Sequence, residues 1–287
     1  MKANKKFKDT LFRHLFNTEE KLLELFNAIF GTDYKDIGAI IINTLENVLF
    51  NGMKNDISFI IYNTLVLLEH QSTISANMPL RMYHYLNYLY EKINSDKPNA
   101  IYGRNLVELP NPVFIILYNG TEDYPAEKIL NISTGLKKGV LDKKFVYLEV
   151  MVININKGRN PELERRCKTL ADYASLIEKV REYQKNHTLE EAIRLAVKYC
   201  INNDILKEYL EQHASEVANM LTTEFSMDDA LKVARWEGKK DGIEEGIEKG
   251  IEEGIQKGRQ EGKLEIIDLL KSGKSPEEIL KDYDKIQ

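Results

Sequence analysis

Two acidic residues, Asp56 and Glu69, are the side chains of this sequence best suited to hold a divalent metal ion. Two ionised carboxylates in an otherwise apolar sheet would be costly without a cation. With the backbone carbonyl of His70 they make a set of oxygen ligands of the kind that Mg²⁺ binds, and Mn²⁺ is an alternative. Gln71 projects to the same side of a strand as Glu69, so its amide can orient a water molecule or a phosphate oxygen. Such a metal ion would polarise a phosphate and activate an attacking water, which is the chemistry of phosphodiester hydrolysis.

Two short apolar runs carry these residues, DISFIIY at 56–62 and LVLLEHQ at 65–71. Both are typical of adjacent strands in a sheet that is covered on both faces. The residues at 63–64 predict a turn between them. Antiparallel pairing around that turn places Asp56 opposite about Gln71, close enough for the two carboxylates to converge.

The role of Arg81 stays open between two interpretations. In one, Asp56 caps a turn, and Glu69 forms an ordinary ion pair with Arg81 or Lys54. In the other, Arg81 forms with Tyr85 and Tyr88 a helix flank that contacts a phosphate beside the site, although the same residues are equally compatible with a helix surface packed by tyrosines. The spacing of the residues is compatible with both.

Several segments together resemble the Rpn-type recombination-promoting nuclease/putative transposase family, within the PD-(D/E)XK nuclease superfamily. The spacing Asp56-x12-Glu69-x-Gln71 is similar to the degenerate superfamily signature, with Asn55 in place of the proline and Gln71 in place of the lysine. The resemblance covers residues 5–155 well and the C-terminal glycine repeat loosely. Its other motifs are DTLFRHLF at 9–16, LEHQST at 68–73, MPLR at 78–81 followed by Tyr85, and the strand end Tyr118-Asn119-Gly120.

The resemblance implies a Mg²⁺-dependent DNA endonuclease associated with recombination or mobile elements. Family members carry glutamine at the third motif position, so Gln71 does not by itself argue for an inactive protein. Asp9 matches the acidic residue that related nucleases place on their first helix. The expected catalytic residues are therefore Asp56, Glu69, Gln71 and Asp9. Two alternatives remain open: a catalytically inactive nuclease fold that acts in binding and assembly, and a nuclease that acts on RNA.

The order of elements predicts an α/β domain, and the resemblance implies a restriction-endonuclease-like core, a central mixed sheet flanked by helices, followed by a helical C-terminal region. We expect three parts: a nuclease-like domain at 1–157, a helical subdomain at 158–236, and a repeat helix with a short final helix at 237–287. The elements expected in them are helices at 5–16, 18–31, 79–93, 161–186, 188–201, 204–222 and 226–236, with later strands at 113–118 and 145–155.

Glycines recur every fourth residue from Gly238 to Gly262, and four of them are followed by isoleucine. Each internal glycine costs a helix about 1 kcal/mol relative to alanine, so a lone helix of this sequence should be unstable. We therefore expect a homo-oligomer in which another backbone packs into the glycine and isoleucine groove. The alternative is a mobile polar tail.

Composition limits the other possibilities. The net charge is −5, which argues against a general nucleic-acid coat protein but not against a nuclease with a local metal site. No apolar run reaches the roughly 18 residues of a membrane span, and no secretory signal is recognisable, so we expect a cytoplasmic protein with no membrane partner. Cys167 and Cys200 have no metal-ligand spacing and are expected to be buried, reduced thiols.

Overall fold

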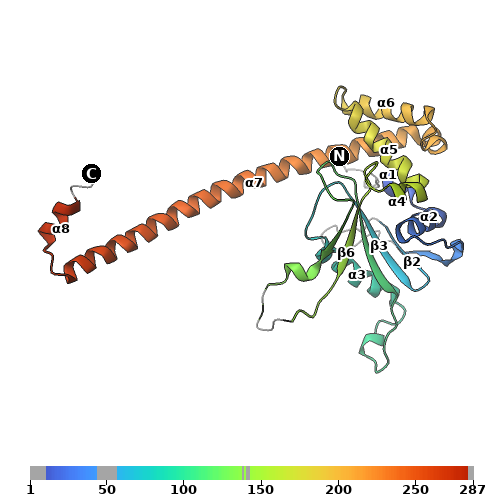
Figure 1. The fold of residues 1–287 in the computed structure, drawn as a ribbon. Helices are drawn as coiled ribbons and strands as arrows, with labels where there is room; N and C mark the ends of the chain where they lie inside the picture. The colour runs from blue at the N-terminus through green and yellow to red at the C-terminus, as the bar shows by residue number, and fades with distance from the viewer. Residues whose placement is uncertain (1–10, 44–56, 138, 140–142, 284–287) are drawn as a thin grey trace, which may run out of the picture. The chain divides into compact units, whose positions relative to one another are not determined.

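The computed structural model describes residues 11–43, 57–137, 139 and 143–283. It divides into two compact units, one that ends at Asp228 and one that begins at Asp229 (Figure 1). Within the described residues no helix is long and apolar enough to cross a membrane. The domain boundaries expected at 157 and 236 remain predictions.

The described strands form one sheet in the order β1-β2-β3-β4-β6-β5. Together with the helices on its faces and the helical C-terminal region, this sheet confirms the predicted mixed α/β architecture. The strands are β1 (Ile40–Ile42), β2 (Ile57–Ile61), β3 (Thr64–Gln71), β4 (Asn111–Tyr118), β5 (Glu127–Asn131) and β6 (Glu149–Asn154). The helices are α1 (Leu11–Leu15), α2 (Glu19–Phe30), α3 (Met78–Ile93), α4 (Pro161–Arg166), α5 (Lys168–Tyr183), α6 (Leu189–Asn202), α7 (Lys207–Lys271) and α8 (Pro276–Tyr283), with short 3₁₀ turns at Ile37–Ala39, Ala100–Tyr102 and Ile132–Gly135.

The hairpin between β2 and β3 turns one residue earlier than predicted. Tyr62 has a φ of 50°, and Ile61 is paired with Thr64, so the two-residue turn is Tyr62-Asn63 instead of 63–64. Tight hairpin turns require such left-handed backbone, which matches the twist of the strands. As a result Ile57 lies opposite Leu68, whereas the predicted turn would have put it opposite about His70.

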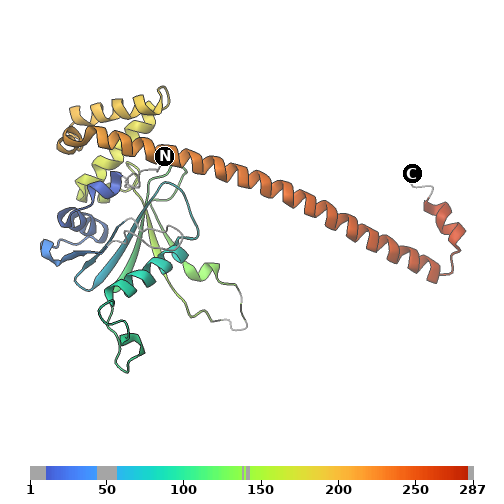
Figure 2. The same ribbon diagram turned by 180° about the vertical axis from the view of Figure 1, so that it is seen from behind.

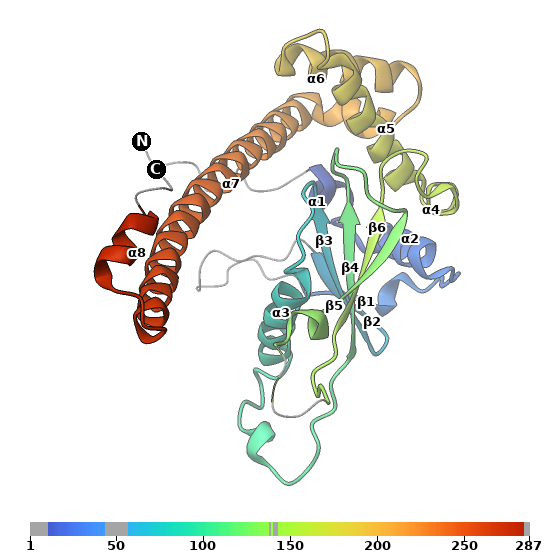
Figure 3. The same ribbon diagram turned by 60° about the vertical axis from the view of Figure 1, so that its left-hand side comes forward.

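Strands β3, β4 and β6 run parallel, side by side in the middle of the sheet (Figure 3). Helix α3 makes the crossover between β3 and β4, and Pro79 stands in its first turn, where the missing N–H costs nothing. Edge strand β5 pairs antiparallel with β6 and was not anticipated. Strand β6 begins at Glu149, so the predicted strand at 145–155 is wrong in its first four residues.

The two faces of the sheet are buried by different helices. Helix α3 lies behind the sheet in Figure 1 and in front of it in Figure 2, and its Met78, Met82 and Leu89 pack on Leu65 and Leu67 of β3. The opposite face carries the larger core. That core joins α1, α2, α5, α6 and the start of α7 to β2, β3 and β4, and includes both buried, unbridged cysteines as predicted.

A carboxylate of α2 caps the start of α5, and a carboxylate of α5 caps the start of α7. Helix α5 starts after Cys167, whose extended φ and ψ interrupt the helix expected at 161–186. The carboxylate of Glu24 in α2 accepts the Thr169 N–H of α5 at 3.3 Å, and Asp172 of α5 accepts the Leu206 N–H at 3.1 Å. A carboxylate at a helix N-terminus satisfies an N–H that the helix leaves without a partner. These two capping contacts help to hold α2, α5 and the start of α7 against one another.

The residues of α7, for which three helices were predicted, form two helices that meet at a kink. The kink lies at His213 (φ −124°, ψ 20°), and the second helix continues through the glycine repeat to Lys271. The short final helix that the sequence predicts is present as α8. Ser275 and Glu278 form a reciprocal capping box at the start of α8, in which Ser275 Oγ accepts the Glu278 N–H and the Glu278 carboxylate accepts the Ser275 N–H.

Candidate functional site

The predicted site residues of β3 point to the face of the sheet that α3 covers. Side chains alternate along a strand, so Glu69 and Gln71 share a face with Leu65 and Leu67. Glu69 is 3% exposed, in a strand that is hydrogen-bonded on both sides. A carboxylate so deeply buried requires a cation or hydrogen-bond donors nearby.

Arg81 of α3 supplies one cation. Its Nη2 lies 3.4 Å from Oε1 of Glu69, while the same nitrogen donates to the hydroxyl of Tyr85 at 2.9 Å. The Tyr85 side chain is 1% exposed, and burial together with the charge of Glu69 raises its pKa to about 12, so the phenol stays protonated. Arg81 is half-buried. The structure therefore contains the ion pair of the first interpretation of Arg81, and the phosphate contact remains a proposal.

Gln71 is also oriented by α3. Its Nε2 lies 2.8 Å from the sulfur of Met78, which is within 3.2 Å of Nη1 of Arg81 as well. Thioethers are weak acceptors, so these contacts position the amide and the guanidinium without binding them strongly. Glu69, Gln71 and Arg81 thus come together at one end of α3.

His70, between these two residues, faces the opposite core. Its ring stacks on Phe12 with centroids 5.0 Å apart, and its Nε2 lies 3.0 Å from the hydroxyl of Tyr173. Burial, followed by the positive charge of Arg181, lowers the pKa of His70 to about 3. The imidazole is therefore neutral and acts as an anchor that fixes the strand on which Glu69 lies.

A polar network that the sequence prediction missed holds the carboxyl ends of the parallel strands. Asn119, directly after β4, donates its N–H to the Gln71 carbonyl at 2.8 Å and its side-chain amide to Tyr173 at 3.3 Å. Arg181 of α5 donates to the Asn119 carbonyl and, at 2.8 Å, to the side-chain oxygen of Asn156. The Asn119-Gly120 dipeptide marked this strand end, but its partners lie up to 62 residues away along the chain.

Gly120 stands at this strand end because no side chain fits there. A Cβ built on it would lie 2.1 Å from the Ser72 carbonyl oxygen and 2.3 Å from the Tyr118 hydroxyl. Ser72 directly follows Gln71, so the close contact between the two strand ends lies next to the candidate site. Close backbone approach is a typical reason for glycine at a buried position.

Three other residues of the predicted site lie outside the described residues. These are the expected ligand Asp56, the expected catalytic residue Asp9, and Lys54, the alternative ion-pair partner of Glu69. Among the described residues there is no group of three or more His, Cys, Asp or Glu side chains placed to hold a metal ion. The buried Glu69 carboxylate is an oxygen ligand of the type that Mg²⁺ binds. The described residues thus provide one suitable ligand, and a complete set needs ligands from outside them.

A comparison with protein families decides where the chain belongs. The model of the family described as "Putative transposase, YhgA-like" matches residues 47–231, more than half of the sequence. The chain belongs to the YhgA-like family. No curated protein and no solved structure matches it.

The YhgA-like match confirms the family recognised from the sequence and shows where its shared part lies. It spans Asp56, the site on β3 and α3, and the network around Arg181. It stops at 231, near the boundary at Asp228 between the two compact units. The glycine repeat therefore lies outside the matched region, as does Asp9.

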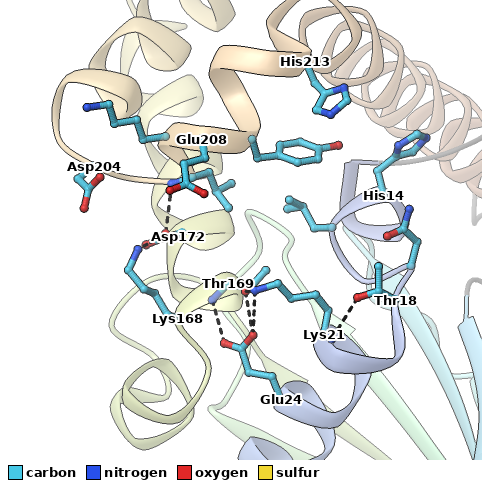
Figure 4. A pocket seen from close by; sticks show the side chains of 15 residues that line it. His14, Thr18, Lys21, Glu24, Lys168, Thr169, Asp172, Asp204, Glu208 and His213 are labelled. Atoms are coloured by element: carbon cyan, nitrogen blue, oxygen red, sulfur yellow. Dashed lines mark hydrogen bonds and ion pairs between the residues drawn. The ribbon is translucent and has the colours of Figure 1, made fainter. Parts of the chain in front are cut away.

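A large cavity elsewhere in this YhgA-like protein lies where several helices pack together. The charges that line it stabilise this packing, so we do not interpret it as a second site. It has a volume of about 840 Å³ and lies between α1, α2, α5 and the start of α7 (Figure 4). Its charged side chains are largely paired with each other. Lys21 contacts Glu24 at 3.2 Å, Lys168 contacts Asp172 at 2.7 Å, and both carboxylates cap helices as described above.

Proposed function

We propose that this YhgA-like protein is a metal-dependent nuclease that hydrolyses phosphodiester bonds in DNA. In the proposal, Glu69, Asp56 and the His70 carbonyl hold Mg²⁺ or Mn²⁺, Gln71 orients the attacking water, and Asp9 assists. The observation that carries it is the burial of Glu69 beside Gln71 and Arg81 in a chain of this family.

Strand register supports the inclusion of Asp56. Ser58 pairs with Leu67 and is buried, so by alternation it belongs to the same face as Glu69. Asp56 precedes Ser58 by two positions, and it is covalently joined to Ile57, the partner of Leu68. If β2 pairing extends by one residue, Asp56 stands opposite Glu69. Two carboxylates on adjacent strands would then share one divalent ion, which would polarise the phosphate and lower the pKa of the attacking water.

The protein's own side chains have separate tasks in this proposal. Glu69 is held in place by β3, which His70 anchors on its other face. Gln71 keeps its amide beside Met78, from where its carbonyl oxygen can accept a hydrogen bond from the attacking water or its N–H can donate one to a phosphate oxygen. Arg81 neutralises Glu69 in the protein alone. When a metal ion occupies the carboxylates, the guanidinium is available for a phosphate oxygen, and Tyr85 holds it in place.

The test is a nicking assay with supercoiled plasmid DNA and Mg²⁺ or Mn²⁺. We expect metal-dependent nicking by the unaltered protein and none by Asp56→Ala or Glu69→Gln, each checked for folding by circular dichroism. An RNA substrate in parallel measures the preference for DNA. Equal nicking by all three proteins would refute the proposal, because a contaminating nuclease would then be the source.

The second candidate is a nuclease fold without catalysis that acts in binding and assembly. The ion pair between Arg81 and Glu69 favours it, since the pair already neutralises the buried carboxylate. Isothermal titration with Mn²⁺ separates the two functions. A site that Glu69→Gln abolishes supports the nuclease, and no heat of binding supports the assembly protein. As part of the nuclease proposal, we also propose a role in recombination or mobile elements and a location in the cytoplasm.

A further inference from the structure

The glycine repeat of α7 presents an open apolar stripe in the second unit. Its four isoleucines are exposed by more than half, with values of 53%, 57%, 59% and 53% for Ile243, Ile247, Ile251 and Ile255. A Cβ added to any glycine from Gly242 to Gly262 would meet no other atom within 4 Å beyond the local helix backbone. A helix that carries this stripe in water is expected to bury it against a partner.

The spacing of the stripe defines the shape of that partner. Steps of four residues follow the i±4 ridges of a helix, and such ridges pack into the matching grooves of a second helix at a crossing angle of about −50°. Glycines in the groove let the two backbones approach closely. A second helix with the same four-residue spacing has both the ridges and the grooves required. Another copy of this chain supplies one.

Charge favours one direction of pairing. The residues directly before successive glycines flank the stripe, and their charges alternate in sign at Lys249, Glu253 and Lys257. In an antiparallel pair this flank faces its own copy. With the pair centred on Ile251, Lys249 lies opposite the second copy's Glu253.

We propose that α7 is the interface between two copies of this chain, paired antiparallel around Ile251. The pair sets Ile247 against Ile255 of the second copy and Ile251 against its own counterpart. On the flank, Lys249 meets Glu253 of the second copy. Such pairs contribute more to the choice of orientation than to the affinity of the dimer. The interface is independent of the nuclease proposal, because it uses residues outside the family match.

Disulfide trapping tests the orientation directly. Chains with Ile247→Cys and chains with Ile255→Cys carry different tags, are mixed as full-length proteins, and are oxidised. The antiparallel pair predicts mixed disulfides between the two variants. Self-links of each variant would show a parallel pair and overturn the proposal, as would a monomeric mass of the unaltered protein in sedimentation.

Two controls make the trapping specific. The native cysteines are buried, so the unaltered protein should give no linked product. Gln256→Cys lies next to the stripe in sequence but on the back of the helix, and should link poorly. If it links as well as the isoleucine positions, random collisions explain the products and the proposal fails.

Charge reversal gives an independent measurement. Lys249→Glu should weaken dimerisation about tenfold, and adding Glu253→Lys should restore it, because the pair is reversed and not removed. A double variant that stays as weak as the single one contradicts the antiparallel register. Gly250→Gln with Gly254→Gln provides the matched packing test: helicity by circular dichroism should rise while dimerisation weakens.

Discussion

Nη2 of Arg81 lies 3.4 Å from Oε1 of Glu69, across the interface between α3 and the central strand β3. The distance is that of a loose ion pair, and the same nitrogen is closer to the Tyr85 hydroxyl, at 2.9 Å. The buried Glu69 carboxylate therefore has the Arg81 guanidinium nearby, and the Tyr85 hydroxyl holds that guanidinium as well. In the proposed nuclease, a metal ion would neutralise Glu69, and Arg81 would then be able to contact the negatively charged phosphate.

Arg81→Met should destabilise the metal-free protein by about 1–3 kcal/mol, because it leaves a buried carboxylate with less compensation. Mn²⁺ should restore much of the loss, since the metal ion then neutralises Glu69. Urea unfolding with and without Mn²⁺ measures both effects. Arg159→Met is the matched control: its ion pair with Asp123 is exposed, and its loss should change the free energy of unfolding by less than about 1 kcal/mol. A loss in Arg81→Met that Mn²⁺ leaves unchanged would argue against a metal site at Glu69.

The neutral His70 predicts a loss of stability in acid. Its folded pKa of about 3 lies below the ordinary value of 6.5, so the unfolded chain binds a proton that the folded chain does not. Stability from this group is complete above pH 6.5 and falls as the pH drops towards 3, by at most about 1.4 kcal/mol per pH unit.

The measurement is the free energy of unfolding in urea between pH 4 and 8, for the unaltered protein and for His70→Gln. The variant cannot take up a proton at this position, so its stability should fall less on acidification. Identical slopes for the two proteins would mean that His70 already titrates normally in the folded chain.

Gly120→Ala should lower the free energy of unfolding by about 1–3 kcal/mol or more, since its methyl group would overlap the Ser72 carbonyl oxygen. The strand ends would have to separate next to Gln71, so any nicking activity should fall as well. Thermal unfolding and the plasmid assay measure the two effects. Gly135→Ala, where a Cβ meets nothing within 4 Å, is the control and should change stability by no more than about 0.5 kcal/mol. Equal stability of the two variants would contradict the close approach.

Asp172→Ala should cost about 1 kcal/mol through loss of the cap on the Leu206 N–H at the start of α7. Asp172→Asn retains an oxygen acceptor and should cost less. Hydrogen exchange of amides in the first turn of α7 localises the effect. If both variants lose the same stability, the ion pair with Lys168 matters more than the cap.

Local sequence signals predicted much of the fold. Thr18 and Gly31 delimit α2, and Thr188 accepts the N–H of Glu191 at the start of α6, each because capping depends on neighbours in sequence. The break at Cys167 was missed because its cause, the Glu24 carboxylate on Thr169, lies more than a hundred residues away. The hairpin turn was predicted one residue too late because Tyr62 adopts left-handed backbone, which the sequence does not favour.

The candidate site divides in the same way. Glu69 and Gln71 were placed on one face by strand alternation, which is a local rule. The contact of Arg81 with Glu69 was left open between two interpretations until the packing of α3 on β3 was known. The pairing of His70 with Tyr173, 103 residues apart, depends on how α5 crosses the sheet, and no local pattern contains that information.

The most direct test of the central claim is a crystal structure of the protein soaked with Mn²⁺, with the ion located by its anomalous scattering. The account predicts one strong peak within about 2–2.5 Å of a Glu69 carboxylate oxygen and of an Asp56 carboxylate oxygen. A peak that lies elsewhere, or clear density for both carboxylates with no ion between them, would contradict it.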